Sequence, residues 1–456
     1  MAAMMRGPRR ATSTVVAPAG PTRTPAAPAS TQTPPTPVGA PSTQTPATPA
    51  PVRWGRWRRP SFAILCTLFA LESIAANVVH PVEPAFYIAL GLPDWIFGAA
   101  FAAMAFGLFA FSPFWGVISD RLGRVPTLAV TMLLYGIAQL AFLVSTTVPT
   151  ILLARLAAGA FCSGCGVAAM AFVADISDAR TCGRRMTIFA AVQSFATAFG
   201  YLVGGVVGQD DPGRSFVLQF FILAAVALGA IALLIDGPGF HRSNARLTLG
   251  SANPLAAFAD TRAILSPWMV AFLASTVAAC LASAAFDNSF NYYLRDQFGF
   301  PTTYNGYIYA TVGILGLAAN LTLGLRLQRA RDTEGPLAMV LTLAAIVLAS
   351  TLLAANMPLY LGLNLLFYVF NAMYLPLMQA LAIEGDPDGH GRVSGLFQSV
   401  KSLGMVVGAL VAGFVYEVDP RVPFALAAAS FLLAAACAVV ARRLAKTRGR
   451  RERPSA

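Results

Sequence analysis

Long apolar segments alternate with short charged ones over most of this chain of 456 residues. A transmembrane helix needs about 20 consecutive, mostly apolar residues, and twelve segments come close to that length. We therefore predict an all-α membrane protein with twelve transmembrane helices. The predicted spans are 61–80, 94–116, 126–145, 149–173, 186–208, 215–235, 264–286, 304–325, 336–355, 358–382, 393–416 and 422–442.

The composition supports a membrane protein and argues against a nucleic-acid-binding one. The chain is 57% hydrophobic and 11% charged, with a mean hydropathy of +0.65, whereas soluble domains carry about 25% charged residues. The net charge of +12 comes from basic residues in short loops and at the chain ends. They do not form the basic, aromatic-interleaved surface of a nucleic-acid-binding protein, so we expect no nucleic-acid partner.

Arginines gather in alternate loops, and this asymmetry predicts the topology. Short cytoplasmic loops carry the Lys/Arg excess, so the arginine-rich loops should be cytoplasmic, as should both termini. Arg53 and Trp54 begin a basic, aromatic anchor before the first span. The arginine-rich loops contain Arg121, Arg124, Arg180, Arg184, Arg185, Arg242, Arg246, Arg262, Arg326, Arg329, Arg331 and Arg392, and the opposite loops contain only Arg214, Arg295 and Arg421.

The segments outside the spans divide the chain into five parts. Residues 1–59 are rich in Pro, Thr and Ala, and such a tract buries too little apolar surface to repay its ordering entropy, so we predict a disordered cytoplasmic tail. The longest internal loop, 237–262, separates a half of six spans at 60–236 from a second half at 263–445. A basic cytoplasmic tail follows at 446–456.

The loop after the second span carries the most specific motif. It reads Gly116-Val-Ile-Ser-Asp120-Arg121-Leu-Gly123-Arg124, which resembles the signature loop of the major facilitator superfamily of secondary transporters. The resemblance implies two pseudo-symmetric halves with a substrate path between them. We predict that Asp120 caps or pairs across a cytoplasmic gate, and that Arg121 and Arg124 contact neighbouring helix ends. The alternative is a tight turn with no gating role.

Two charged residues inside the spans are candidates for proton coupling. Glu72 lies about 11 residues, or roughly 16 Å, into the first span, where an ionised carboxylate is costly and usually functional. Arg155 heads Arg155-Leu-Ala-Ala-Gly159, which resembles the fourth-helix motif implicated in proton coupling in the superfamily. We predict that Arg155 is the only basic residue well inside a span and that Glu72 is its partner. The alternatives are a neutral packing glutamate and a static ion pair.

The fifth span contains closely spaced glycines. Gly200-Tyr201-Leu-Val-Gly204-Gly205 resembles the motif Gly-Pro-x-x-Gly-Gly of drug/proton antiporters, with Tyr201 in place of the proline. Glycines four residues apart let helices approach closely. The predicted helix-packing glycines are Gly159, Gly200, Gly204, Gly205 and Gly208.

Polar residues recur at helical spacing on three spans and predict a substrate cavity. The resemblance makes helices 1, 4, 7 and 10 the lining set. We expect about half of these residues to touch substrate and the rest to join helices, and we place Asp287 near the outer end of helix 7. The candidate cavity residues are Ser73, Asn77, His80, Thr276, Ser283, Asp287, Asn291, Asn364, Tyr368, Asn371 and Tyr374.

These features predict a secondary transporter, not an enzyme, working by proton-coupled efflux of a drug-like or amphipathic small molecule. Proton-coupled nutrient uptake and translocation of a lipid-like substrate remain alternatives, as does a receptor or enzyme on the same fold. We expect no cofactor and no metal, with a proton gradient as the energy source. The expected partners are the substrate, protons and the lipid bilayer of the cell membrane, around a monomeric protein.

Overall fold

The computed structural model describes residues 61–178, 181–237, 240, 266–328, 333–384 and 392–451. The predicted tail 1–59 and nearly all of the central loop 237–262 lie outside the described residues, as do the last five residues of the basic tail.

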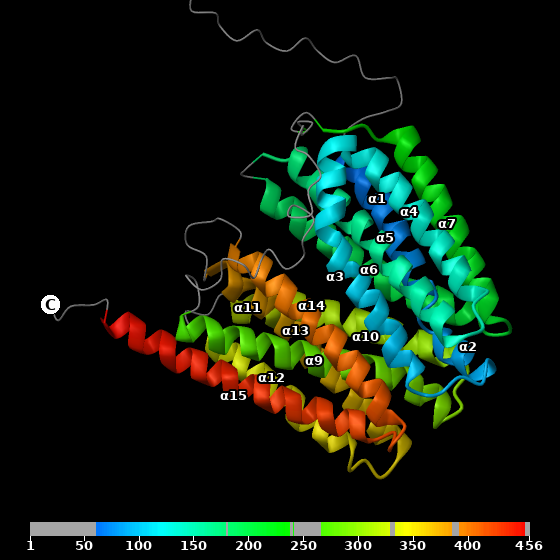
Figure 1. Cartoon of the computed structure of the whole chain (residues 1–456). Helices are drawn as coiled ribbons and strands as arrows, with labels where there is room; N and C mark the ends of the chain where they lie inside the picture. Colours follow the sequence, from blue (N-terminus) through cyan, green and yellow to red (C-terminus); the bar gives the residue numbers. More distant parts are fainter. Residues whose placement is uncertain are drawn as a thin grey trace, which may run out of the picture. The chain divides into compact units, whose positions relative to one another are not determined.

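The part of the chain that the structure describes consists of helices and their connections, with no β-strand assigned. Figure 1 shows the helices coloured along the sequence. The first group is α1 (Phe62–Val78), α2 (Glu83–Ala89), α3 (Ile96–Leu122), α4 (Arg124–Leu143), α5 (Val148–Asp175), α6 (Cys182–Val207) and α7 (Pro212–Leu233).

The second group follows the central loop. It is α9 (Pro267–Asp296), α10 (Thr302–Ala319), a short π-helix (Asn320–Gly324), α11 (Leu325–Gln328), α12 (Glu334–Thr351), α13 (Met357–Glu384), α14 (Arg392–Tyr416) and α15 (Val422–Arg451). We call α1–α7 the first helix set and α9–α15 the second helix set.

The predicted all-α architecture is confirmed: twelve segments of the described residues are long and apolar enough to cross a membrane. The ends of the first and seventh spans differ from the prediction. The first span continues beyond the break at Pro81 through α2, to Ala89. The seventh span ends at Asp296, whereas the prediction ends it at residue 286. Its last turns are polar but pack against other helices, so a prediction from hydropathy alone ends the span too early.

Local sequence explains where several helices begin. Ser61 caps α1 by accepting a hydrogen bond from the Ile64 amide at 3.4 Å, and Ser266 caps α9 in the same way at 3.2 Å from Met269. Such caps satisfy backbone N–H groups that have no partner within the helix. Gly123 has φ +111°, a conformation that glycine adopts readily, and it joins the end of α3 to the start of α4.

Each set packs mainly on itself: α5 contacts α3 and α4, whereas α9 contacts α14 and α15. The sets meet mainly through two helix pairs, α6 with α10 and α3 with α14, and less extensively where α9 contacts α2 and α3. Glycines permit both crossings. A Cβ on Gly205 would lie 2.8 Å from the Gly306 Cα, and one on Gly98 would lie 2.2 Å from the Ala409 carbonyl oxygen.

Candidate functional site

Hydrogen bonds join the two helix sets at the end of the bundle opposite the arginine-rich loops. The Asn291 amide on α9 donates to the His80 carbonyl oxygen at 2.8 Å. The Tyr292 hydroxyl donates to Asp94, which precedes α3, at 2.7 Å. Trp95 stacks on Phe414 with ring centroids 5.5 Å apart. The structure is therefore closed at this end.

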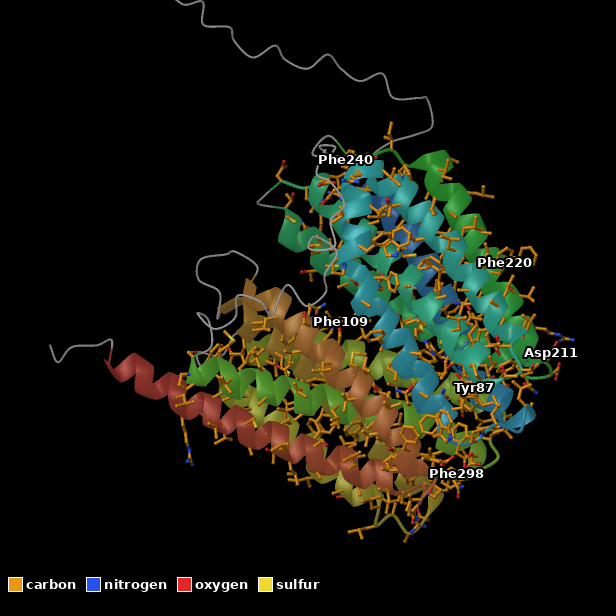
Figure 2. The ribbon with its side chains drawn as sticks, viewed as in Figure 1. Tyr87, Phe109, Asp211, Phe220, Phe240 and Phe298 are labelled. Atoms are coloured by element: carbon orange, nitrogen blue, oxygen red, sulfur yellow. The ribbon has the colours of Figure 1, made fainter. Side chains whose placement is uncertain are left out.

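A buried ion pair lies just inside that closed end. Arg155 on α5 is 1% exposed and pairs with Glu83 at the start of α2. Its guanidinium also lies over the Phe142 ring, 4.5 Å from the centroid. His80 Nδ1 is 3.2 Å from the same Glu83 carboxylate, and the buried Tyr87, labelled in Figure 2, adjoins Arg155. A permanent charge inside a membrane needs such a partner.

The predicted pairing of Arg155 with Glu72 is wrong, because Glu83 takes that place. Side chains lean toward the N-terminus of their own helix. The α5 helix starts at the closed end, so Arg155 leans toward α2. The antiparallel α1 starts at the other end, so Glu72 leans away from Arg155.

Glu72 occupies a separate buried position in the first set. Its side chain accepts a hydrogen bond from Ser73 at 3.3 Å and is 4% exposed. Tyr135 on α4 and Cys162 on α5 lie near this carboxylate. Within the described residues it forms no ion pair. Glu72 is thus a carboxylate deep in the bundle without a fixed counter-charge.

A second interior carboxylate, Asp287, lies on α9; the residue is half-buried, and its Oδ1 atom is buried. Ser283 donates a hydrogen bond to it at 3.2 Å, and the Tyr309 hydroxyl donates to its backbone carbonyl at 2.9 Å. The expectation that Asp287 lies near the outer end of helix 7 is wrong, since α9 continues for nine residues beyond it to Asp296. The cause is the polar but buried last part of α9.

Aromatic side chains connect the two carboxylate regions across the helix sets. His80 stacks on Tyr201 at 5.8 Å, and Tyr201 stacks on Tyr309 at 4.7 Å between ring centroids. Tyr309 then meets Tyr368 edge-on at 6.1 Å. Tyr201, which stands where the antiporter motif has proline, therefore lies at the contact between the sets.

The other predicted cavity residues differ in whether they form hydrogen bonds between helices, within their own helix, or not at all. Tyr374 approaches the Cys280 sulfur at 4.0 Å, which links α13 to the polar side of α9. Asn77 donates to Ser73 and to Thr197 of α6 at 2.8 and 3.3 Å. Two others bond within their own helix, Thr276 to Phe272 and Asn364 to Tyr360, and the Asn371 side-chain oxygen is buried without a hydrogen bond.

The glycines predicted to pack helices lie at close crossings. A Cβ on Gly204 would be 1.9 Å from the Val78 carbonyl oxygen of α1, and one on Gly200 would be 2.5 Å from that of Ile74. One on Gly208 would be 2.3 Å from the Val82 side chain. Gly159 brings α5 against α3, with a Cβ 2.0 Å from the Met104 carbonyl oxygen.

The motif from Gly116 to Arg124 forms a charged cluster at the arginine-rich end, but the expectation that it is a loop is wrong, since α3 continues to Leu122 and only Gly123 separates it from α4. Arg124 pairs with Asp120 in the last turns of α3 and with Asp175 at the end of α5, the latter at 2.8 Å. Asp236, beyond α7, accepts a hydrogen bond from the Val125 amide at 2.8 Å. Arg124 thus contacts a neighbouring helix end. The gating role of Asp120 and Arg121 stays a prediction.

Two charged residues of the interior were missed by sequence reasoning. Glu83 follows Pro81 and stands only three residues beyond the end of the predicted span 61–80. Lys401 lies eight residues into the predicted span 393–416, so Arg155 is not the only basic residue well inside a span. In both cases a charge bordered by apolar sequence was the available signal.

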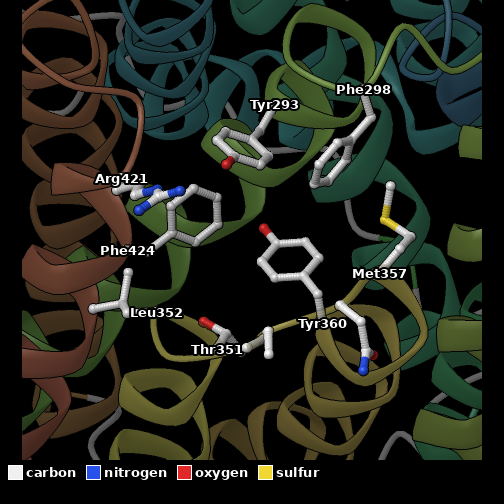
Figure 3. A pocket seen from close by; sticks show the side chains of 11 residues that line it. Tyr293, Phe298, Thr351, Leu352, Met357, Tyr360, Arg421 and Phe424 are labelled. Carbon is white, nitrogen blue, oxygen red and sulfur yellow. The ribbon is translucent and has the colours of Figure 1, made fainter.

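A small cavity of about 230 Å³ lies away from these groups, at the closed end of the second set. Figure 3 shows the Tyr360 ring between Tyr293, Phe298 and Phe424, with Arg421 at the edge. The cavity is lined by residues of α9, α12, α13 and α15 and their connections. It contains none of the predicted site residues.

Twelve membrane-length helices with ionisable groups buried between them define a multi-pass membrane protein. The family model of the Major Facilitator Superfamily matches residues 61–382 and 335–456. The chain belongs to this superfamily of transporters, and both its family and its fold are those of transporters rather than enzymes.

Relatives and solved structures agree with this assignment. Multidrug resistance protein 2 of Bacillus subtilis is 23% identical over 80% of this chain and 91% of its own length. Tetracycline resistance protein, class C, of Escherichia coli is 26% identical over 76% and 87%. The fold is similar to a bacterial homologue of the human lysosomal transporter Spinster in an inward-facing conformation (TM-score 0.69, 14% identity, covering 84% of this chain and 96% of that one). It is also similar to the human organic anion transporter MFSD10 (TM-score 0.61, 19% identity, covering 83% and 99%).

Proposed function

We propose that this transporter exports drug-like, amphipathic small molecules from the cell in exchange for protons, by alternating access. The named drug-resistance relatives support efflux of such molecules. The observation that carries the coupling is Glu72, a carboxylate that is 4% exposed and close to the middle of α1. Among the described residues Ser73 is its only hydrogen-bond donor, so it can change its proton occupancy when its surroundings change between conformations.

The asymmetry of the loops supports an orientation for this mechanism. Positive charge favours the cytoplasmic side, so we place the arginine-rich loops and both termini in the cytoplasm of a cell membrane. The end closed by Asn291 and Tyr292 then faces outward, and the structure corresponds to a state closed to the outside. The protein acts as a monomer, with the proton gradient as its energy source and no bound cofactor.

The Arg155–Glu83 pair has a different proposed role from Glu72. Glu83 also contacts His80, whose carbonyl oxygen accepts the hydrogen bond from Asn291 of the second set. The ion pair therefore supports the segment that closes the outer end. We propose that Arg155 influences coupling through this closure rather than through a direct contact with Glu72.

Purified protein in liposomes with an imposed pH gradient tests the proposal, with the fluorescent dye rhodamine B as substrate. The Glu72→Gln variant removes the proton site and keeps the side-chain volume, so gradient-driven dye transport should fall at least tenfold. Glu417→Gln, at an exposed carboxylate after α14, should transport normally.

Two results would contradict this function. Glu72→Gln protein that still moves the dye at the normal, gradient-dependent rate excludes Glu72 as the proton site. Dye flux in the same direction as the protons would show uptake instead of efflux.

A further inference from the structure

Lys401 is an unusual residue for its position. The chain has only two lysines, Lys401 and Lys446, beside its many arginines. Lys401 lies nine residues after the start of α14 at Arg392, or about 14 Å along the helix axis. A charged side chain at that depth faces a cavity or a partner, because hydrocarbon does not solvate it.

The face of α14 that carries Lys401 points into the bundle. The exposed apolar residues of α14 are Leu403, Val407, Leu410 and Phe414. They recur at helical spacing on one side of the helix. At 100° per residue, Lys401 lies about 160° away from Leu403, on the opposite side of the helix.

The neighbouring helix on that side is α9. A Cβ on Gly404 would lie 2.7 Å from the Val277 carbonyl oxygen, and one on Gly408 would lie 2.3 Å from that of Leu281. Gly404, three residues after Lys401 and on the same side of α14, would place a Cβ 3.1 Å from the Cys280 Cβ of α9. Cys280 belongs to the polar side of α9 that continues through Ser283 to Asp287.

The surroundings of Lys401 do not supply a counter-charge. Within the described residues Lys401 forms no ion pair, whereas Arg155, the other basic residue deep in a span, is held by Glu83. The groups next to Cys280 are hydroxyls such as that of Tyr374, at 4.0 Å. The nearest carboxylate along α9, Asp287, is seven residues beyond Cys280, about 10 Å further along the axis.

We propose that Lys401 binds the carboxylate of the transported molecule, while Asp287 receives its positively charged group. This inference rests on the proposed transport function and narrows its substrates to zwitterionic, amphipathic molecules. The ammonium is a compact charge with three donors, and it gains from a substrate carboxylate the counter-charge that no described residue supplies. The phenol rings of Tyr309 and Tyr368 border the Asp287 end and suit an aromatic body between the two charges.

A pair of dyes that differ only at the carboxylate tests this directly. Rhodamine B is a zwitterion with a free carboxylate, and its ethyl ester is a cation of nearly the same shape. Binding is measured by fluorescence polarisation with purified protein in lipid nanodiscs, without a pH gradient. The wild-type protein should bind the acid about tenfold more tightly than the ester, since a hydrogen bond between two charged groups is stronger than one between neutral groups.

Variants of Lys401 then assign the preference to this side chain. Lys401→Met should weaken binding of the acid about tenfold and leave the ester unchanged, and Lys401→Arg should keep the preference. Lys446→Met, at the chain's other lysine, should behave as the wild type does. A thermal melt of each variant checks that the protein is folded, and Lys401→Gln serves as the replacement if the Met variant is not.

The proposal is overturned if the wild-type protein binds the ester as tightly as the acid. It is also overturned if folded Lys401→Met or Lys401→Gln protein keeps the preference for the acid. Because binding without a gradient does not depend on proton coupling, these results are separate from the liposome test of Glu72.

Discussion

The interiors of the two helix sets handle charge differently. In the first set the buried cation Arg155 is paired with Glu83, and His80 is in contact with the same carboxylate. In the second set Lys401 and Asp287 have no ion-pair partner among the described residues, and Asp287 is bonded by the neutral hydroxyl of Ser283. The interior cation of the first set is therefore paired, although the carboxylate Glu72 of that set is not, whereas the interior cation of the second set has no such partner.

This contrast distinguishes charges that stabilise the fold, such as the Arg155–Glu83 pair, from charges that are free to bind a ligand, such as Lys401 and Asp287. A buried ion pair mainly satisfies its own members, and removing one member is costly because the other remains buried. A buried charge without a partner is tolerated only where water, protons or a substrate reach it. The difference supports the proposed roles, in which the Arg155–Glu83 pair closes the outer end and Lys401 and Asp287 recognise a charged substrate.

The strongest test of this contrast is the Arg155→Met variant. Glu83, with a side chain only 12% exposed, would lose its counter-charge. We expect the free energy of unfolding to fall by about 3–5 kcal/mol, visible as a lower melting temperature in detergent. Exchanging both partners, as Arg155→Met with Glu83→Gln, should restore most of the loss.

The Lys401→Met variant is the matched control in the second set. No protein carboxylate loses a partner in it, so its melting temperature should stay near that of the wild type. The contrast between the two interiors fails if Arg155→Met melts like the wild type, or if Lys401→Met loses as much stability as Arg155→Met does.

A moderate effect is expected where the two sets meet. Asn291→Ala removes the hydrogen bond to the His80 carbonyl, which is 2.8 Å long. A loss of about 1 kcal/mol would shift the equilibrium between closed and open outer ends about fivefold toward open. Asn288→Ala is the control, because the Asn288 amide bonds to Ala284 within α9 at 2.8 Å.

Pulsed electron paramagnetic resonance measures this shift as the distance between spin labels attached at positions 210 and 417, where the native residues are Asp210 and Glu417. Both positions are exposed, and they belong to different helix sets at the closed end. The labels are attached in a background whose native cysteines have been replaced. A distance distribution that is the same in Asn291→Ala and Asn288→Ala would show that this hydrogen bond does not hold the end closed.

The smallest effect is expected at the junction of α3 and α4. The Asp120 side chain is 49% exposed, and its partner Arg124 keeps a second contact with Asp175. Asp120→Asn should therefore change stability by less than about 1 kcal/mol, as measured by thermal melting. Asp175→Asn, at a carboxylate 16% exposed, should cost more, and the reverse order would contradict this explanation of the junction.

Much of the fold was predictable because it depends on local properties. The length of each apolar segment predicts a span, and the arginines in alternate loops predict an orientation. The motif from Gly116 to Arg124 indicates the superfamily. Even the glycines of α6 and their role in close packing follow from a spacing of four residues.

The sequence by itself thus determined that the chain crosses the membrane repeatedly, which segments do so, and which family it belongs to. Only the tertiary structure decided which charges meet. Arg155 pairs with Glu83 and not with Glu72. Side chains on antiparallel helices lean in opposite directions along the bundle, so the side chains of Arg155 and Glu72 point away from each other. Asp287 is half-buried because the polar end of α9 packs against other helices. Contacts of this kind depend on helix direction and rotation, which hydropathy does not encode.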